Sequence, residues 1–93
     1  RFGGEEFVVL LIDADLESAS MVAERIRASV AAQPVDIGSG ERLDVTVSIG
    51  VAALSDFARD HAVEGVAQEL IASADAALYQ AKAGGRNKVV TFA

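Results

Sequence analysis

Hydrophobic residues follow two different patterns in the first third of the chain, and each pattern predicts one element. Residues 7–12 (FVVLLI) form a short apolar run, which is typical of a strand buried on both faces. Beyond it, apolar residues recur every three or four positions, which predicts an amphipathic helix. The apolar stripe of this helix consists of Leu16, Ala19, Ala23, Ile26 and Val30. Asp15 is expected to cap its first turn, and Pro34 is expected to end it.

The middle of the chain has the pattern of a β-hairpin. The turn sequence at residues 38–40 (GSG) separates a short apolar run, 35–37, from a longer one, 43–53. Within the longer run, residues 45–49 (VTVSI) alternate with the period of two that a strand requires. We therefore expect residues 43–53 to form the second arm of the hairpin.

The last third of the chain predicts a second helix and a final strand. Residues 55–64 (SDFARDHAVE) are mixed in character and are expected to form a loop that leads into the helix. The apolar stripe of this helix consists of Val66, Leu70, Ala74, Ala77, Leu78 and Ala81. Gly84 and Gly85 are expected to end it with a left-handed cap. Residues 89–92 (VVTF) then predict a short strand.

Together these elements predict one α+β domain over residues 1–93. Their order is strand, helix, hairpin, helix, strand, with no repeat and no internal linker. We expect a two-layer sandwich in which both helices pack on one face of a mostly antiparallel sheet. The core is expected to be thin, because 52% of the residues are hydrophobic but many of these are alanines.

Length and charge exclude several classes of protein. The hydrophobic content excludes disorder, and the longest uncharged stretch, residues 45–55, is far shorter than the roughly 20 apolar residues of a membrane span. A net charge of −6 makes a nucleic-acid polymer an unsuitable ligand, because such binding needs a basic face. The last twelve residues nevertheless contain three basic residues and no acidic one, which favours a small anionic ligand. The absence of cysteine excludes disulfides and thiolate metal sites.

The opening sequence, RFGGEEF, contains a candidate metal site. Gly3 and Gly4 permit a tight turn and a close approach of backbone amides to a ligand. Glu5 and Glu6 follow at the start of a strand, where alternation turns them to opposite faces, so that only one can serve a given site. A carboxylate beside such a turn is a suitable ligand for Mg²⁺. The alternative is a glycine turn followed by solvated acids, which fits this pattern better when it is taken alone.

A second candidate site lies at the end of the second helix. Lys82 is in the last helical turn, and Arg86 follows Gly85 and precedes Asn87. Both cations could bind one anion, and arginine can do so through two hydrogen bonds. Alternatively, they only complement the negative end of the helix dipole. The combination of a metal-binding carboxylate with a Lys/Arg pair favours the first interpretation, because a nucleoside triphosphate requires both.

Four other residues are expected to have no catalytic role. His61 lies in a polar segment without a second metal ligand and is expected to be solvated. Ser48 has no His or Asp at a spacing that suits a nucleophile. Asp75 is expected to hydrogen-bond locally, and Tyr79 is expected to pack in the core or at its edge with a solvated hydroxyl.

Three separated motifs resemble those of the GGDEF-domain diguanylate cyclases. Residues 3–7 (GGEEF) resemble the family's signature, and residues 47–51 (VSIGV) resemble its SIG strand. Residues 74–82 (ADAALYQAK) and 85–87 (GRN) resemble the end of its last long helix. The likeness extends over residues 1–90, with the motifs in the expected order, and only the segment around 55–65 has no counterpart.

This resemblance implies a nucleotidyl-cyclase, palm-like fold and the condensation of two GTP molecules to cyclic di-GMP, with release of pyrophosphate. Glu5 would bind the catalytic Mg²⁺ (or Mn²⁺) and help to deprotonate the attacking 3′-hydroxyl. Gly3 and Gly4 would line the nucleotide site. Lys82 and Arg86 would hold the terminal phosphates.

The resemblance also implies that the chain is part of a longer domain. A family domain is about twice this length, so we expect the chain to be the C-terminal half of a GGDEF domain and to be inactive alone. A second metal-binding aspartate and the guanine-binding residues are expected before Arg1.

Further expectations concern partners and location. Each family domain binds one GTP, so catalysis would need a homodimer, and an upstream sensor or receiver domain is expected in the parent protein. The domain is expected to be cytoplasmic, including in a parent that is anchored in a membrane. The alternatives are a catalytically inactive module that acts as a receptor for GTP or cyclic di-GMP, and a dimerisation domain.

Overall fold

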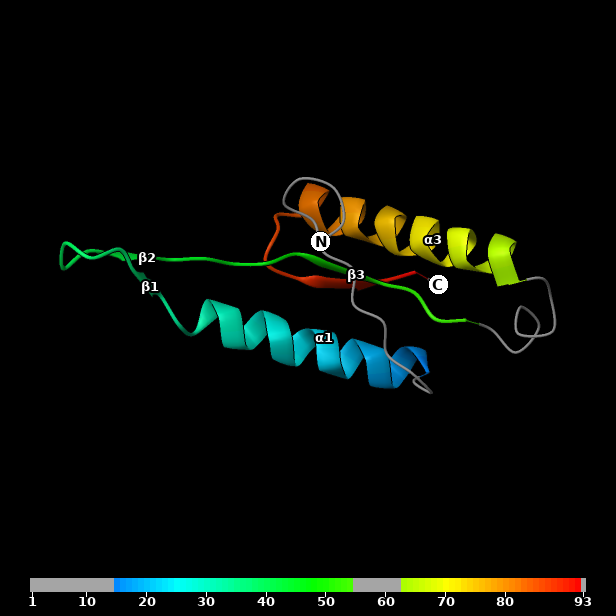
Figure 1. Ribbon diagram of the computed structural model, residues 1–93, viewed down its shortest axis with the longest axis horizontal. Coiled ribbons are helices and arrows are strands. Elements are labelled where there is room, and N and C mark those ends of the chain that lie inside the picture. The colour runs from blue at the N-terminus through cyan, green and yellow to red at the C-terminus, as the bar shows by residue number, and fades with distance from the viewer. Residues whose placement is uncertain (1–14, 55–62, 93) are drawn as a thin grey trace.

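The computed structural model describes residues 15–54 and 63–92. The strand predicted at residues 7–12 lies outside these residues, as does most of the loop predicted at 55–64. In chain order, the described elements are α1 (Leu16–Ala31), β1 (Val35–Asp36), β2 (Arg42–Leu43), β3 (Ile49–Val51), α3 (Val63–Ala83) and β4 (Val89–Thr91) (Figure 1).

Helix α1 begins and ends close to the predicted positions. The Oδ1 atom of Asp15 accepts a hydrogen bond from the backbone N–H of Ser18 at 2.8 Å, which satisfies one of the free N–H groups of the first turn. Because this hydrogen bond stabilises the charged carboxylate, the pKa of Asp15 lies below its ordinary value. The helix ends at Ala31, shortly before Pro34. The predicted N-cap is therefore confirmed.

The predicted hairpin is confirmed, but its second arm is much shorter than expected. Strands β1 and β2 pair antiparallel, with Val35 opposite Leu43. Gly38 and Gly40 in the turn have φ angles of +92° and +79°, which glycine adopts without steric cost. Residues 44–48 form no strand, and pairing resumes only at β3. The arm is short because β1 supplies only two pairing residues.

Strands β3 and β4 pair in parallel, which corrects the expectation of a mostly antiparallel sheet. The register places Ile49 opposite Val89 and Val51 opposite Thr91. Since α3 connects the two strands, the chain crosses over and returns in the same direction, as a parallel pair requires. Of the two strand pairs in the described residues, only β1–β2 is antiparallel.

Helices α1 and α3 cover opposite faces of the β3–β4 pair. Both helices contact both strands, no close contact joins the helices themselves in the described residues, and the strands run between them (Figure 1). Gly50 faces α3, because a Cβ added there would lie 2.1 Å from the carbonyl oxygen of Ala74. Alternation along the strand turns Ile49 and Val51 to the other face. The α+β class is confirmed, but the expected packing of both helices on one face is corrected, because each face of β3 receives a helix.

Helix α3 matches the predicted second helix. It begins at Val63, slightly before the predicted apolar stripe, and ends at Ala83, next to the predicted glycine cap. Within residues 15–54 and 63–92, neither α1 nor α3 is long and apolar enough to cross a membrane.

The core of the described residues is small, as the alanine content predicts. Its buried members are Ala23, Val51, Ala77 and Ala81. Tyr79, in contrast, is 74% exposed, so the expected packing role of this residue is wrong. Two positions along a helix turn a side chain by about 200°, which directs Tyr79 away from the face that buries Ala77 and Ala81.

Candidate functional site

Two of the predicted site residues lie at the junction between α3 and β4. Lys82 is in the last turn of α3, and Arg86 is in the connection formed by residues 84–88, which we call the α3–β4 loop. Other positions singled out in the sequence lie outside the described residues: Gly3, Gly4, Glu5, Glu6 and His61.

The end of α3 has the hydrogen bonds of a Schellman cap. The N–H of Gly85 donates to the carbonyl oxygen of Lys82 at 3.4 Å, and the N–H of Arg86 donates to that of Ala81 at 2.9 Å. Gly85 has a φ of +114°, as the predicted left-handed cap requires. The cap reverses the chain directly after the helix and thereby places Arg86 just beyond the last turn of α3, which contains Lys82.

The two residues after the cap also have left-handed backbones, which the sequence does not predict. Arg86 has a φ of +65° and Asn87 a φ of +49°. Such a conformation costs roughly 1–2 kcal/mol for a residue with a side chain, although asparagine tolerates it better than most. The α3–β4 loop must therefore be held in place by contacts with other parts of the chain.

One set of these contacts comes from β3 and the residue before it. The hydroxyl oxygen of Ser48 accepts a hydrogen bond from the N–H of Asn87 at 3.2 Å. The N–H of Ile49 donates to the carbonyl oxygen of Lys88 at 3.0 Å, and the ammonium group of Lys88 donates to the carbonyl oxygen of Gly84. Ser48 thus anchors the loop through its hydroxyl, a role that sequence reasoning missed.

A second anchor comes from α1, through Arg27. Its Nη1 donates to Oδ1 of Asn87 at 2.8 Å, while its Nε and Nη2 donate to the two carboxylate oxygens of Glu24 at 2.6 Å each. The hydrogen bond with the opposite charge lowers the pKa of Glu24 and raises the pKa of Arg27 from their ordinary values. The i, i+3 spacing could have revealed the Glu24–Arg27 pair, but no sequence signal joins Arg27 to a residue 60 positions away.

The α3–β4 loop carries two basic residues, Arg86 and Lys88, close to the carbonyl end of α3. This end of a helix carries partial negative charge and repels an anion, so an anion here must be held by side chains rather than by the backbone. Lys88 already hydrogen-bonds to a terminal carbonyl, whereas the Arg86 side chain is exposed. An exposed guanidinium on an anchored backbone can bind a phosphate through two hydrogen bonds.

The described residues do not contain a metal site of their own. Within residues 15–54 and 63–92, no three His, Asp or Glu side chains gather closely enough to hold a metal ion. Asp75 is exposed on α3. The proposed ligand Glu5 lies outside this part of the chain, so its fit to a magnesium ion stays a prediction.

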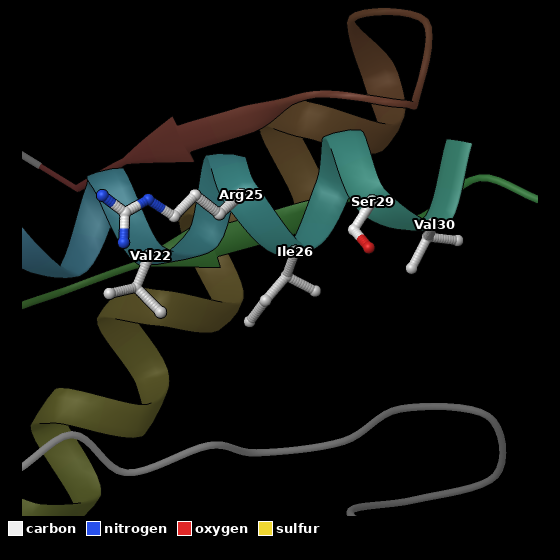
Figure 2. A pocket seen from close by; sticks show the side chains of 5 residues that line it. All are labelled: Val22, Arg25, Ile26, Ser29 and Val30. Carbon is white, nitrogen blue, oxygen red and sulfur yellow. The ribbon is translucent and has the colours of Figure 1, made fainter. Parts of the chain in front are cut away.

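A shallow depression on α1 is a separate feature. It is lined by Val22, Arg25, Ile26, Ser29 and Val30. Figure 2 shows Val22, Ile26 and Val30 projecting from the same side of the helix. This mostly apolar surface has one cation and lacks the paired charges that a phosphate group needs.

Comparison with known proteins supports the motif interpretation. Residues 1–88 match the sequence profile of the family described as "Diguanylate cyclase, GGDEF domain". The chain is 49% identical over 92 residues to the response regulator PleD of Caulobacter vibrioides, covering 97% of this chain and 19% of PleD. It is 45% identical over 89 residues to the diguanylate cyclase DgcP of Pseudomonas aeruginosa, covering 96% of this chain and 12% of DgcP.

A more distant relative gives the same assignment. Diguanylate cyclase A of Treponema denticola is 39% identical over 89 residues, covering 96% of this chain and 22% of that protein. The chain thus spans less than a quarter of the length of the relatives it matches. Because the family profile covers almost all of its residues, the chain belongs to the GGDEF-domain family of diguanylate cyclases.

Proposed function

We propose that this chain is the C-terminal part of a GGDEF domain that condenses two GTP molecules to cyclic di-GMP and releases pyrophosphate. The family match and the names of the relatives support the reaction. The observation that carries the proposal is the anchored α3–β4 loop, in which the exposed Arg86 follows Lys82 by four residues, just beyond the end of α3. Its chemistry suits the terminal phosphates of a nucleotide.

The residues of this chain would bind two different parts of the nucleotide complex. Lys82 and Arg86 would hold the terminal phosphates. Gly3 and Gly4 would let the backbone approach the nucleotide, and Glu5 would hold the Mg²⁺ (or Mn²⁺) ion. The metal, when bound, neutralises phosphate charge and favours loss of the 3′-hydroxyl proton.

A single domain would bind one GTP, so the reaction would need two domains that face each other as a homodimer. The remaining nucleotide-binding residues would come from chain that precedes Arg1, together with a sensor or receiver domain that controls dimerisation. The 93-residue chain alone would therefore be inactive, and the intact parent protein, with a cytoplasmic GGDEF domain, is the form to test.

The test is the formation of cyclic di-GMP by the intact parent protein with GTP and Mg²⁺, measured by chromatography. We expect turnover in the wild type. Arg86→Ala should raise the KM for GTP about tenfold or more, because a charge-assisted hydrogen bond is lost. Arg42→Ala, an equal change of charge on the exposed strand β2, should leave the KM unchanged. Absence of product would overturn the proposal, and GTP binding without turnover would instead favour a receptor.

A further inference from the structure

Among the hydrogen bonds within residues 15–54 and 63–92, Arg27 is the one side chain of α1 that bonds to the α3–β4 loop. Its Nη1 reaches Oδ1 of Asn87 at 2.8 Å, and Asn87 also donates its N–H to Ser48. The loop is therefore fixed between α1 on one side and the start of β3 on the other. Neither Arg27 nor Glu24 belongs to the motifs that carry the family resemblance.

The hydrogen bond between Arg27 and Asn87 lies at the part of the loop with the least favourable backbone conformation. Arg86 and Asn87 are consecutive left-handed residues, a conformation that persists only where surrounding contacts determine it. The backbone of Arg86 is fixed on its N-terminal side by the cap of α3. On its C-terminal side it depends on Asn87, whose side chain is bound by Arg27.

The geometry also argues against a direct role for Arg27 in phosphate binding. Its Nε and Nη2 are directed to both carboxylate oxygens of Glu24 at 2.6 Å, and its Nη1 is directed to Asn87. The adjacent carboxylate offsets its charge. Such an ion pair orients the guanidinium firmly and leaves it poorly suited to attract an anion.

We propose that Arg27, oriented by Glu24, is a positioning residue that acts on the phosphate ligand through Asn87 and Arg86. The inference rests on the proposed function, because it concerns the same site. Loss of Arg27 would free the side chain of Asn87 and allow Arg86 to leave the orientation that binds phosphate. Removing Arg27 should then weaken binding of the phosphate ligand only in a protein that still has Arg86.

A double-mutant cycle on the intact parent protein tests this dependence. The ligand is the α,β-methylene analogue of GTP, which cannot react, so that its Kd can be measured by calorimetry without turnover. Arg27→Gln should weaken binding about fivefold to tenfold, and Arg86→Ala at least as much. The double variant should bind no worse than Arg86→Ala alone. If the two effects multiply, Arg27 acts independently of Arg86 and the proposal is overturned.

The melting temperature of Arg27→Gln will show whether this variant folds. If it does not, a variant at the other end of the hydrogen bond provides the same test. Asn87→Gly removes the acceptor but keeps a residue that adopts positive φ readily. It should weaken binding as Arg27→Gln does, and combining the two should add nothing; additive losses would contradict the proposal. Arg27→Lys should lose less than Arg27→Gln, and Arg42→Gln should lose nothing.

The same measurements separate this inference from the proposed function. Binding of the analogue with the expected cycle, but no cyclic di-GMP from GTP, would overturn only the proposed reaction. If the protein makes cyclic di-GMP but the binding losses of Arg27→Gln and Arg86→Ala multiply, only the role of Arg27 is overturned. A wild-type protein that binds no analogue would overturn both.

Discussion

The β1–β2 hairpin and the α3–β4 loop both reverse the chain through residues with positive φ, but different parts of the sequence hold them. In the hairpin, Oδ1 of Asp36 accepts from the N–H of Gly38 at 2.8 Å, and Ile37 bonds to the carbonyl oxygen of Glu41. In the α3–β4 loop, Asn87 is held by residues 39 and 60 positions away. One turn is determined locally and the other by the fold.

Their surroundings differ accordingly. The side chains of Val35, Ile37 and Leu43 in the hairpin are about half exposed, and in the described residues β1 and β2 contact only each other among the named elements (Figure 1). The α3–β4 loop instead follows the most deeply buried part of α3, which contains Ala81. A change in the packing of α3 should therefore alter the conformation of the α3–β4 loop, whereas a change in the hairpin should alter only the hairpin.

The largest effect is expected from Gly50→Ala. The new Cβ would lie 2.1 Å from the carbonyl oxygen of Ala74 and 2.3 Å from the backbone nitrogen of Leu78, so α3 would have to move away from β3. We expect a loss of roughly 3 kcal/mol or more in the free energy of unfolding. Urea unfolding of the intact protein, followed by circular dichroism, measures it.

Gly65→Ala is the matched control for that experiment, because a Cβ at this position of α3 meets nothing within 4 Å. Alanine favours helix over glycine, so stability should rise by up to about 1 kcal/mol. Equal stability of the two variants would show that β3 and α3 are not closely packed at Gly50.

The next effect compares the two turns directly, through Gly85→Ala and Gly38→Ala. The two glycines have φ angles of +114° and +92°, so alanine should cost about 1–2 kcal/mol of stability at either position. Only Gly85→Ala should also weaken binding of the GTP analogue, because only this turn orients Arg86. Equal binding by the two variants would remove the distinction between the local and the anchored turn.

The difference between local and long-range contacts also explains which features the sequence could predict. Asp15, the glycines at 38–40 and the glycine cap act within a few residues, so the cap of α1, the hairpin and the end of α3 were predicted correctly. The parallel pairing of β3 with β4 and the helix on each face depend on packing between distant segments. For the same reason, the sequence offered Lys82 and Arg86 as candidates, but it did not predict that Ser48 and Arg27 hydrogen-bond to Asn87.

A smaller effect is expected from the cap of α1, which is another local contact. The hydrogen bond from Ser18 lowers the pKa of Asp15 in the folded protein. Its stabilisation should therefore be complete above the ordinary pKa of an aspartate and be lost as the pH falls through the lowered value. Melting temperatures measured at decreasing pH will show this small loss.

Two substitutions isolate the charge of Asp15 from its capping role. Asp15→Asn keeps an acceptor for Ser18 and should remove this part of the pH dependence, while Asp15→Ala should lower the melting temperature at neutral pH. Identical acid profiles for the wild type and Asp15→Asn would show that Asp15 does not contribute.

The smallest effect is expected on the exposed face of the hairpin. Val35 and Leu43 are cross-strand partners with 48% and 54% of their surface exposed. Replacing both with threonine, which suits a strand, should change the free energy of unfolding by less than about 0.5 kcal/mol. Binding of the GTP analogue should not change, because among the helices and strands of the described residues β1 and β2 contact only each other. A loss as large as that of Gly85→Ala would mean that these side chains are covered in the intact protein, and the hairpin could no longer be treated as a turn that acts locally.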